Sequence, residues 1–135
     1  MQIKHANVTT PDVAGLVALF QRFFGFELVA KRGQDAFALM RDANGFVLTL
    51  MKPKKRDPDR YPEMFHLGFY CDNSDLVRAK HVELTAAGLS PGEVENVDRG
   101  GAVTTFYFRP AAADILIEVA TPPGFVAQAV SADPE

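Results

Sequence analysis

The sequence predicts an α+β protein made of two modules, each with a strand, a helix and three further strands. Three observations carry this prediction: the same order of elements occurs twice in 135 residues, a charged and proline-rich segment separates the copies, and the first strand of each copy contains a histidine. The chain can form one sizeable core and is too short for two ordinary independent domains. We therefore expect one structural domain.

The first module is expected over residues 1–53. Thr10 and Pro11 follow a strand-like stretch and predict a helix start, with Thr10 as the N-cap. Apolar residues at spacings of three and four predict a helix that ends at Gly25. An Asn-Gly pair predicts a hairpin between the last two strands. The expected strands cover residues 3–8, 26–33, 36–42 and 46–53.

The second module is expected over residues 63–121, after a linker at 54–62 that is rich in proline and charge. Its first strand is followed by Asn73 or Ser74 as the N-cap of a helix that ends at Gly88. Residues 122–135 are expected to form a tail. The expected strands cover residues 65–70, 92–97, 102–108 and 114–120.

Composition limits the possible functions. Hydrophobic residues make up 47% and charged residues 23% of the chain, as in soluble globular proteins. No membrane helix or signal peptide is recognisable, so we expect no membrane partner and a cytoplasmic location. The net charge of −3 argues against nucleic-acid binding. The single cysteine, Cys71, excludes an internal disulfide and a thiolate zinc site.

Aligning the two modules pairs polar residues at equivalent places. His5 aligns with His66, and Thr49 aligns with Glu118. Strand alternation puts His66 and Tyr70 on the face opposite the apolar residues of their strand. Two imidazoles and one carboxylate suit Fe, Mn, Zn or Ni and leave coordination positions open for a substrate.

Glu118 lies between two apolar residues in mid-strand. A carboxylate that is half buried there needs a compensating cation, because an unpaired buried charge costs several kcal/mol. The alternative is that Glu118 faces solvent on a one-sided sheet.

With these elements and residues, the chain resembles the vicinal oxygen chelate superfamily, which includes glyoxalases, bleomycin resistance proteins and extradiol dioxygenases. The resemblance implies a glyoxalase-like fold in which each module forms half a barrel around a cleft, and a homodimer. It also implies that His5, His66 and Glu118 hold one divalent metal per site, Fe, Mn, Zn or Ni. Glu118 and Tyr70 are the expected catalytic residues, with Tyr70 as a hydrogen-bond donor.

The chain differs from some members of the superfamily that it resembles. Lactoylglutathione lyase and the superfamily's epimerases use a carboxylate where this chain has Thr49, which argues against these two activities. In the strand before the last turn, side-chain alternation is expected to place Phe106 and Phe108 on the ligand face and to point Tyr107 away from it. The substrate wall is expected to contain Thr49, Met51, Phe106, Phe108 and Arg99.

The leading hypothesis is a metal-dependent lyase, dioxygenase or thiol transferase that acts on a small oxygen-chelating substrate. The alternative is a metal-free protein of the bleomycin resistance type that binds or sequesters a small molecule. The reaction, the metal and the pairing of modules within one chain or between two stay open at this stage.

Overall fold

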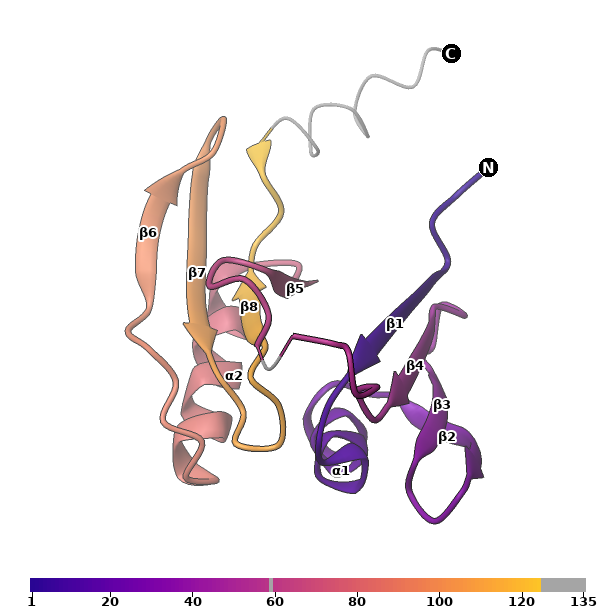
Figure 1. Ribbon diagram of the computed structural model, residues 1–135. Helices are drawn as coiled ribbons and strands as arrows, with labels where there is room; N and C mark the ends of the chain where they lie inside the picture. Colours follow the sequence, from indigo (N-terminus) through magenta and orange to yellow (C-terminus); the bar gives the residue numbers. More distant parts are fainter. Residues whose placement is uncertain (59, 125–135) are drawn as a thin grey trace. The chain divides into compact units, whose positions relative to one another are not determined.

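The computed structural model describes residues 1–58 and 60–124, and the predicted order of elements is confirmed in both modules (Figure 1). The chain divides into two compact units. Residues 1–61 with 110–114 form the first unit, and residues 62–109 with the chain from 115 onward form the second. The turn before the last strand therefore belongs to the first unit. Most of the expected tail lies outside the described residues.

The first unit is a four-stranded sheet covered by one helix. Its strand order is β1-β4-β3-β2, with β1 parallel to β4 and the other pairs antiparallel. The elements are β1 (His5–Thr9), α1 (Val13–Phe23), β2 (Glu27–Arg32), β3 (Phe37–Arg41) and β4 (Val47–Met51).

The core of this unit lies between α1 and the sheet. Leu16 and Phe20 of the helix are fully buried, as are Met40 of β3 and Leu50 of β4. In β4 the side chains alternate, so that Leu48 and Leu50 pack in this core while Thr49 lies on the other face. The face of β4 that carries Thr49 is the face on which we predicted the candidate site.

Asp12, and not the predicted Thr10, is the N-cap of α1. Its Oδ1 accepts a hydrogen bond from the Gly15 N–H at 2.9 Å. Thr10 is buried, and its hydroxyl donates to the Ala112 carbonyl at 2.6 Å. The observed N-cap differs from the predicted one because the hydroxyl of Thr10 donates to a partner far along the chain.

The second unit repeats this arrangement with strand order β5-β8-β7-β6. Its helix begins after Asn73, one of the two predicted caps, whose side chain accepts from the Leu76 N–H. Phe106 packs edge-on against the His81 ring of this helix, with 5.0 Å between the ring centroids. The elements are β5 (His66–Tyr70), α2 (Ser74–Ala86), β6 (Glu95–Asp98), β7 (Ala102–Phe108) and β8 (Leu116–Ala120).

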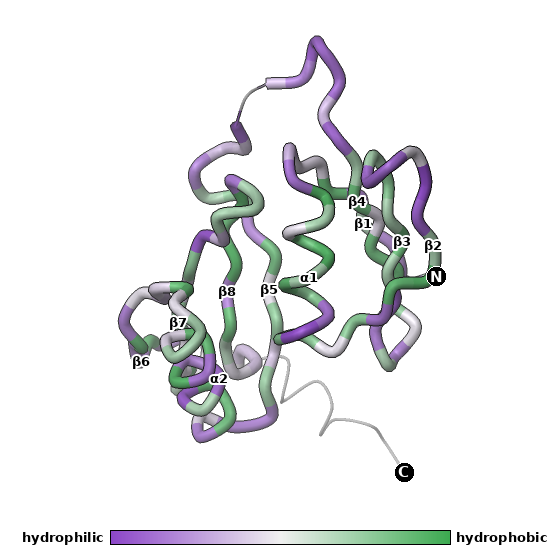
Figure 2. Tube along the Cα trace, turned by 90° about the horizontal axis from the view of Figure 1, so that it is seen from below, coloured by the Kyte–Doolittle hydropathy of each residue, from purple (hydrophilic) through white to green (hydrophobic). Residues whose placement is uncertain are grey.

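Figure 2 shows that α1 and the central strands are mostly hydrophobic, whereas the segment after β4 is strongly hydrophilic. This segment is the predicted linker, and it forms no helix or strand over its described residues. Among the described residues, no helix has the length and apolar character needed to cross a membrane.

Replacing Asp12 by Ala should destabilise the first unit by about 1 kcal/mol, because the first turn of α1 loses its side-chain acceptor. Asp12→Asn keeps an acceptor oxygen and should cost much less. Urea unfolding of the two variants beside the wild type measures the difference. Equal stability of Asp12→Ala and the wild type would contradict the assignment of the cap.

Candidate functional site

The register of both sheets places equivalent residues side by side on the central strands β4 and β8. Thr49 on β4 lies opposite Asn7 of β1 and Leu39 of β3. Glu118 on β8 lies opposite Gly68 of β5 and Tyr107 of β7. The pairing of Thr49 with Glu118 that the sequence repeat predicts is therefore confirmed at the level of strand register.

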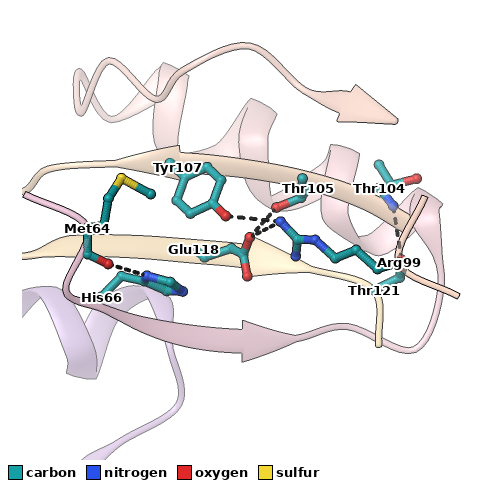
Figure 3. Close-up of polar contacts among 8 residues, drawn as sticks. All are labelled: Met64, His66, Arg99, Thr104, Thr105, Tyr107, Glu118 and Thr121. Atoms are coloured by element: carbon teal, nitrogen blue, oxygen red, sulfur yellow. Dashed lines mark hydrogen bonds and ion pairs between the residues drawn. The ribbon is translucent and has the colours of Figure 1, made fainter. Parts of the chain in front are cut away.

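Glu118 is buried, with 5% of its surface exposed, so the alternative of a solvent-facing carboxylate is wrong. Its Oε2 accepts hydrogen bonds from Arg99 Nη2 at 3.0 Å and from the Thr105 hydroxyl at 2.9 Å (Figure 3). Arg99 provides the compensating cation that a buried carboxylate requires. Oε1 is the carboxylate atom nearer to Gly68.

Arg99 reaches this carboxylate from the turn between β6 and β7. The turn is closed by a hydrogen bond from the Arg99 N–H to the Gly101 carbonyl, and Asp98 accepts from the Gly101 N–H. Gly100 and Gly101 have φ angles of 75° and 147°, values that favour glycine. The same Nη2 of Arg99 also donates to the Tyr107 hydroxyl at 3.1 Å.

These contacts change the titration of all three groups. Burial alone would raise the pKa of Glu118, but hydrogen bonds from Arg99, Tyr107 and Thr105 outweigh it and hold the pKa below its ordinary value. The hydrogen bond to Glu118 raises the pKa of the Arg99 guanidinium. Burial, followed by the hydrogen bond with Glu118, raises the pKa of Tyr107. The cluster is therefore ionised as a carboxylate and a guanidinium beside a neutral phenol.

His66 lies on the same strand face as Gly68, and its ring nitrogens have different roles. Nδ1 lies 2.8 Å from the Met64 carbonyl. A carbonyl only accepts, so Nδ1 is the donor of this hydrogen bond. The ring meets Tyr107 edge-on, with centroids 5.8 Å apart. Figure 3 shows His66 and Arg99 on either side of the Glu118 carboxylate.

His5 occupies the equivalent place in the first unit, in a neutral environment. Its Nε2 lies 3.1 Å from the Thr49 hydroxyl. That hydroxyl in turn donates to Asn7 Oδ1 at 2.7 Å, so it accepts from His5. The first unit therefore presents a histidine and a hydroxyl where the second presents a histidine and a carboxylate.

The fit of a divalent metal can be judged from these donors. A metal-binding histidine usually donates its other N–H to a carbonyl or carboxylate, and a metal-binding carboxylate is itself hydrogen-bonded. His66 and Glu118 both have this support. Within residues 1–58 and 60–124, no group of three or more His, Cys, Asp or Glu side chains is gathered for a metal. The second unit thus offers two suitable donors, and the expected third, His5, belongs to the first unit.

The predicted aromatic face of β7 is wrong. Phe108 pairs with Ile117 and Tyr107 with Glu118, so Tyr107 and Thr105 share the face of the carboxylate. Phe106 is buried on the opposite face, against α2. Residues 109–115 of the turn set this register, and the turn length was the uncertain quantity in the sequence.

Met51 and Tyr70 are the remaining predicted residues on the strands. Met51 shares the face of Thr49 at the end of β4 and is half-buried. Tyr70 is 59% exposed at the end of β5 and lines a groove beside Leu76 and Lys80 of α2. Sequence reasoning placed Tyr107 on the opposite face and did not select Thr105 as a site residue. Their alternation with buried Phe106 is the signal that could have found them.

Two mixed sheets, each built from a β-α-β-β-β module and each with a histidine beside its central strand, define a protein with the glyoxalase-like fold. The family model of the Glyoxalase/Bleomycin resistance protein/Dioxygenase superfamily matches residues 2–128. The chain belongs to this superfamily, whose members bind small molecules and often depend on a metal.

Solved structures agree with this assignment. A possible glyoxalase from Bacillus cereus is 36% identical, with 88% of this chain and 97% of that chain covered and a TM-score of 0.72. Lactoylglutathione lyase from Agrobacterium tumefaciens is 19% identical, with 89% and 92% covered and a TM-score of 0.70. A glyoxalase/dioxygenase from Nostoc punctiforme is 14% identical, with 90% and 91% covered and a TM-score of 0.68. The last two show the fold alone. No curated protein matches.

The lowered pKa of Glu118 predicts a specific loss of stability in acid. A carboxyl whose pKa is lower in the folded state stabilises the fold above its unfolded pKa of about 4.3, and this stabilisation is lost as the pH falls through the folded pKa. Glu118→Gln should therefore reduce the difference in free energy of unfolding between pH 7 and pH 3. Urea titrations at both pH values measure it.

The control for this experiment is Glu27→Gln, because Glu27 pairs with Arg41 on the exposed surface of the first unit. Exposed pairs contribute little to stability, so this variant should keep the pH dependence of the wild type. If both variants change the pH dependence equally, the burial of Glu118 is not its cause.

Proposed function

We propose that this protein is a metal-dependent enzyme that acts on a small oxygen-bearing substrate at the polar face of the second sheet. The observation that carries the proposal is the state of His66 and Glu118. On one face, an imidazole whose Nδ1 donates to the Met64 carbonyl lies beside an ionised carboxylate whose orientation is fixed by Arg99 and Thr105.

In this proposal His66 and Glu118 hold the metal, and His5 of the first unit is the third ligand. His5 must then give up its hydrogen bond to Thr49, which costs little because a net hydrogen bond contributes only about 1 kcal/mol. We propose that the protein is a homodimer. His5 then comes either from the same chain as His66 and Glu118 or from the second copy. Bound there, a metal would act as a Lewis acid that stabilises negative charge on a substrate oxygen.

The chain's own residues define what surrounds that substrate. Arg99 and the Tyr107 hydroxyl give this face a guanidinium and a phenol that can hydrogen-bond substrate oxygens. Thr49 presents a neutral hydroxyl where a carboxylate base would be needed for proton abstraction, which favours reactions without a base on β4. Of the expected reaction types, the 36% identity to the possible glyoxalase of Bacillus cereus supports a lyase, and the family model also includes dioxygenases.

Metal content tests this proposal directly. Protein purified without a tag and without oxygen, then loaded with Fe, Mn, Zn or Ni, should hold about one metal per site by elemental analysis. Glu118→Gln and His66→Ala should lower metal affinity by at least about tenfold, since each removes one of three protein ligands. His5→Ala should do the same, which separately tests the ligand from the first unit.

The matched control is His81→Asn, because His81 is the third histidine of the chain and lies on α2 with its Nε2 near the Gly92 carbonyl. This variant should retain the metal. Equal metal content in the wild type and in all three ligand variants would reject the metal site.

A second candidate is a metal-free protein that binds or sequesters a small molecule. It is favoured by one observation: Arg99 already supplies Glu118 with a cation at 3.0 Å. A protein that holds no metal under any loading, yet binds a small molecule that protects it against thermal unfolding, would support this function.

A further inference from the structure

We propose that Gly124 is a positioning residue for the candidate site. Residues 121–124, called the strap below, follow β8 and hold the turn that carries Arg99, so that they set where the Arg99 guanidinium meets Glu118. This inference rests on the proposed function, because it concerns the carboxylate that is proposed to hold the metal. It adds a residue that lies outside the strands and acts on the site through another residue.

The strap is anchored to the second sheet. The Thr121 N–H donates to the Thr104 carbonyl at 2.9 Å, and the Thr121 hydroxyl oxygen accepts from the Thr104 N–H at 3.0 Å. Figure 3 shows this pair at the end of the sheet from which Arg99 reaches back towards Glu118. Pro123 of the strap is buried, and proline has a fixed φ angle. The strap is therefore a stiff segment attached to β7.

The far end of the strap closes onto the Arg99 turn. The Gly124 N–H donates to the Arg99 carbonyl at 3.0 Å, and the Arg99 N–H donates to the Gly101 carbonyl at 3.0 Å. Both backbone hydrogen-bonding groups of Arg99 are thus in use. Its side chain reaches Glu118 and Tyr107 through Nη2, at 3.0 and 3.1 Å. The strap therefore acts directly on the backbone from which the guanidinium extends.

Close contact with the turn explains why residue 124 is glycine. A Cβ built on Gly124 would lie 1.8 Å from the Gly100 carbonyl oxygen and 3.0 Å from the Gly101 nitrogen. Gly100 and Gly101 have positive φ angles and Gly124 does not, so its own backbone conformation does not require glycine. In Gly124→Ala the methyl group must move by about 1.6 Å, from 1.8 Å to an ordinary contact distance of 3.4 Å. A displacement of this size breaks the hydrogen bond between the Gly124 N–H and Arg99.

Release of the turn has a consequence for the carboxylate. Because 32% of the Arg99 side chain is exposed, water can replace Glu118 as its partner once the backbone is no longer held. The carboxylate then loses one of the donors that orient it, and Thr105 remains. Partners that hydrogen-bond a metal ligand typically change metal affinity by about ten- to a hundredfold. Gly124 thus acts on the proposed metal site through Arg99.

The test follows Arg99 by NMR in the full-length protein, before and after loading with Zn. Its side-chain N–H resonances are identified by their loss in Arg99→Gln. Hydrogen exchange at these groups should be slow in the wild type and at least about tenfold faster in Gly124→Ala, because the ion pair opens more often. Thr121→Val removes the acceptor of the Thr104 N–H without adding bulk. It should also speed exchange at Arg99, to a smaller extent, and it decides the question if Gly124→Ala does not fold.

The matched control is Gly88→Ala in the same unit. Gly88 follows α2 with a φ angle of 79°, and a Cβ built there has no atom of another element within 4 Å. Alanine therefore strains the backbone there without touching the Arg99 turn. This variant should keep the slow exchange of the wild type. Equal acceleration in Gly88→Ala and Gly124→Ala would mean that general loss of stability, and not the strap, controls Arg99, and would overturn the inference.

Zn affinity provides a second readout through a double-variant cycle. Arg99→Gln and Gly124→Ala should each lower Zn affinity by about tenfold. The double variant should lower it no further than Arg99→Gln alone, since both changes remove the same contact. If Gly124→Ala keeps its full effect in the Arg99→Gln background, the effect does not pass through Arg99 and the inference is wrong.

The same samples judge the proposed function separately. Exchange at Arg99 that is equal in the wild type, Gly124→Ala and Thr121→Val would overturn the role of the strap, whatever the Zn affinity of the wild type. A wild type that takes up no Zn, but in which Gly124→Ala accelerates exchange at Arg99, would reject the metal site and leave the role of Gly124 standing.

Discussion

The second unit is organised around one ionised carboxylate in the middle of its sheet. Strand β8 lies between β5 and β7, so Glu118 has strands on both sides and little access to water. Its charge can persist only because Arg99 and Thr105 donate to it. The Gly100–Gly101 turn that carries Arg99 and the register that brings Thr105 to this face both serve that requirement. A change in either would leave a charge inside the sheet without a partner.

The two units show how one backbone plan can support two kinds of chemistry. In both, a parallel pair joins the first and last strands, and the histidine lies two residues before the position opposite the central polar residue. Thr49, Asn7 and His5 form a hydrogen-bonded chain without a carboxylate in the first unit. In the second unit Glu118 carries a negative charge, and Arg99 pairs with it. The duplicated fold thus supplies one polar cluster without a carboxylate and one with an ionised carboxylate.

The sequence predicted most of the fold and only part of the site, for identifiable reasons. Hydrophobic periodicity and turn residues report local structure, so the order of elements and the Asn73 cap were accessible. The cap of α1 was predicted at Thr10 because the partner of its hydroxyl, Ala112, is remote in sequence. The face of β7 was predicted wrongly because a single-residue change in register reverses it.

The charged pair itself shows the same limit. Glu118 could be identified as a residue that needs a cation, and Arg99 could be selected as a substrate contact. Nothing local indicated that the two would meet, since the contact depends on how two hairpins lie in one sheet. Tyr107 was predicted to point away because the register of β7 against β8 was not accessible. Side chains that depend on long-range pairing are the part of a site that periodicity cannot supply.

Gly68 has a consequence for how this site can be altered. It lies next to Glu118 in the sheet, its backbone is that of an ordinary strand, and a Cβ there would lie 3.9 Å from Oε1, an ordinary van der Waals distance. The backbone therefore does not require glycine at this position. Substitutions at position 68 with side chains of increasing size would therefore fill the space beside the Glu118 carboxylate in steps. The strand and the Arg99–Glu118 ion pair would stay in place.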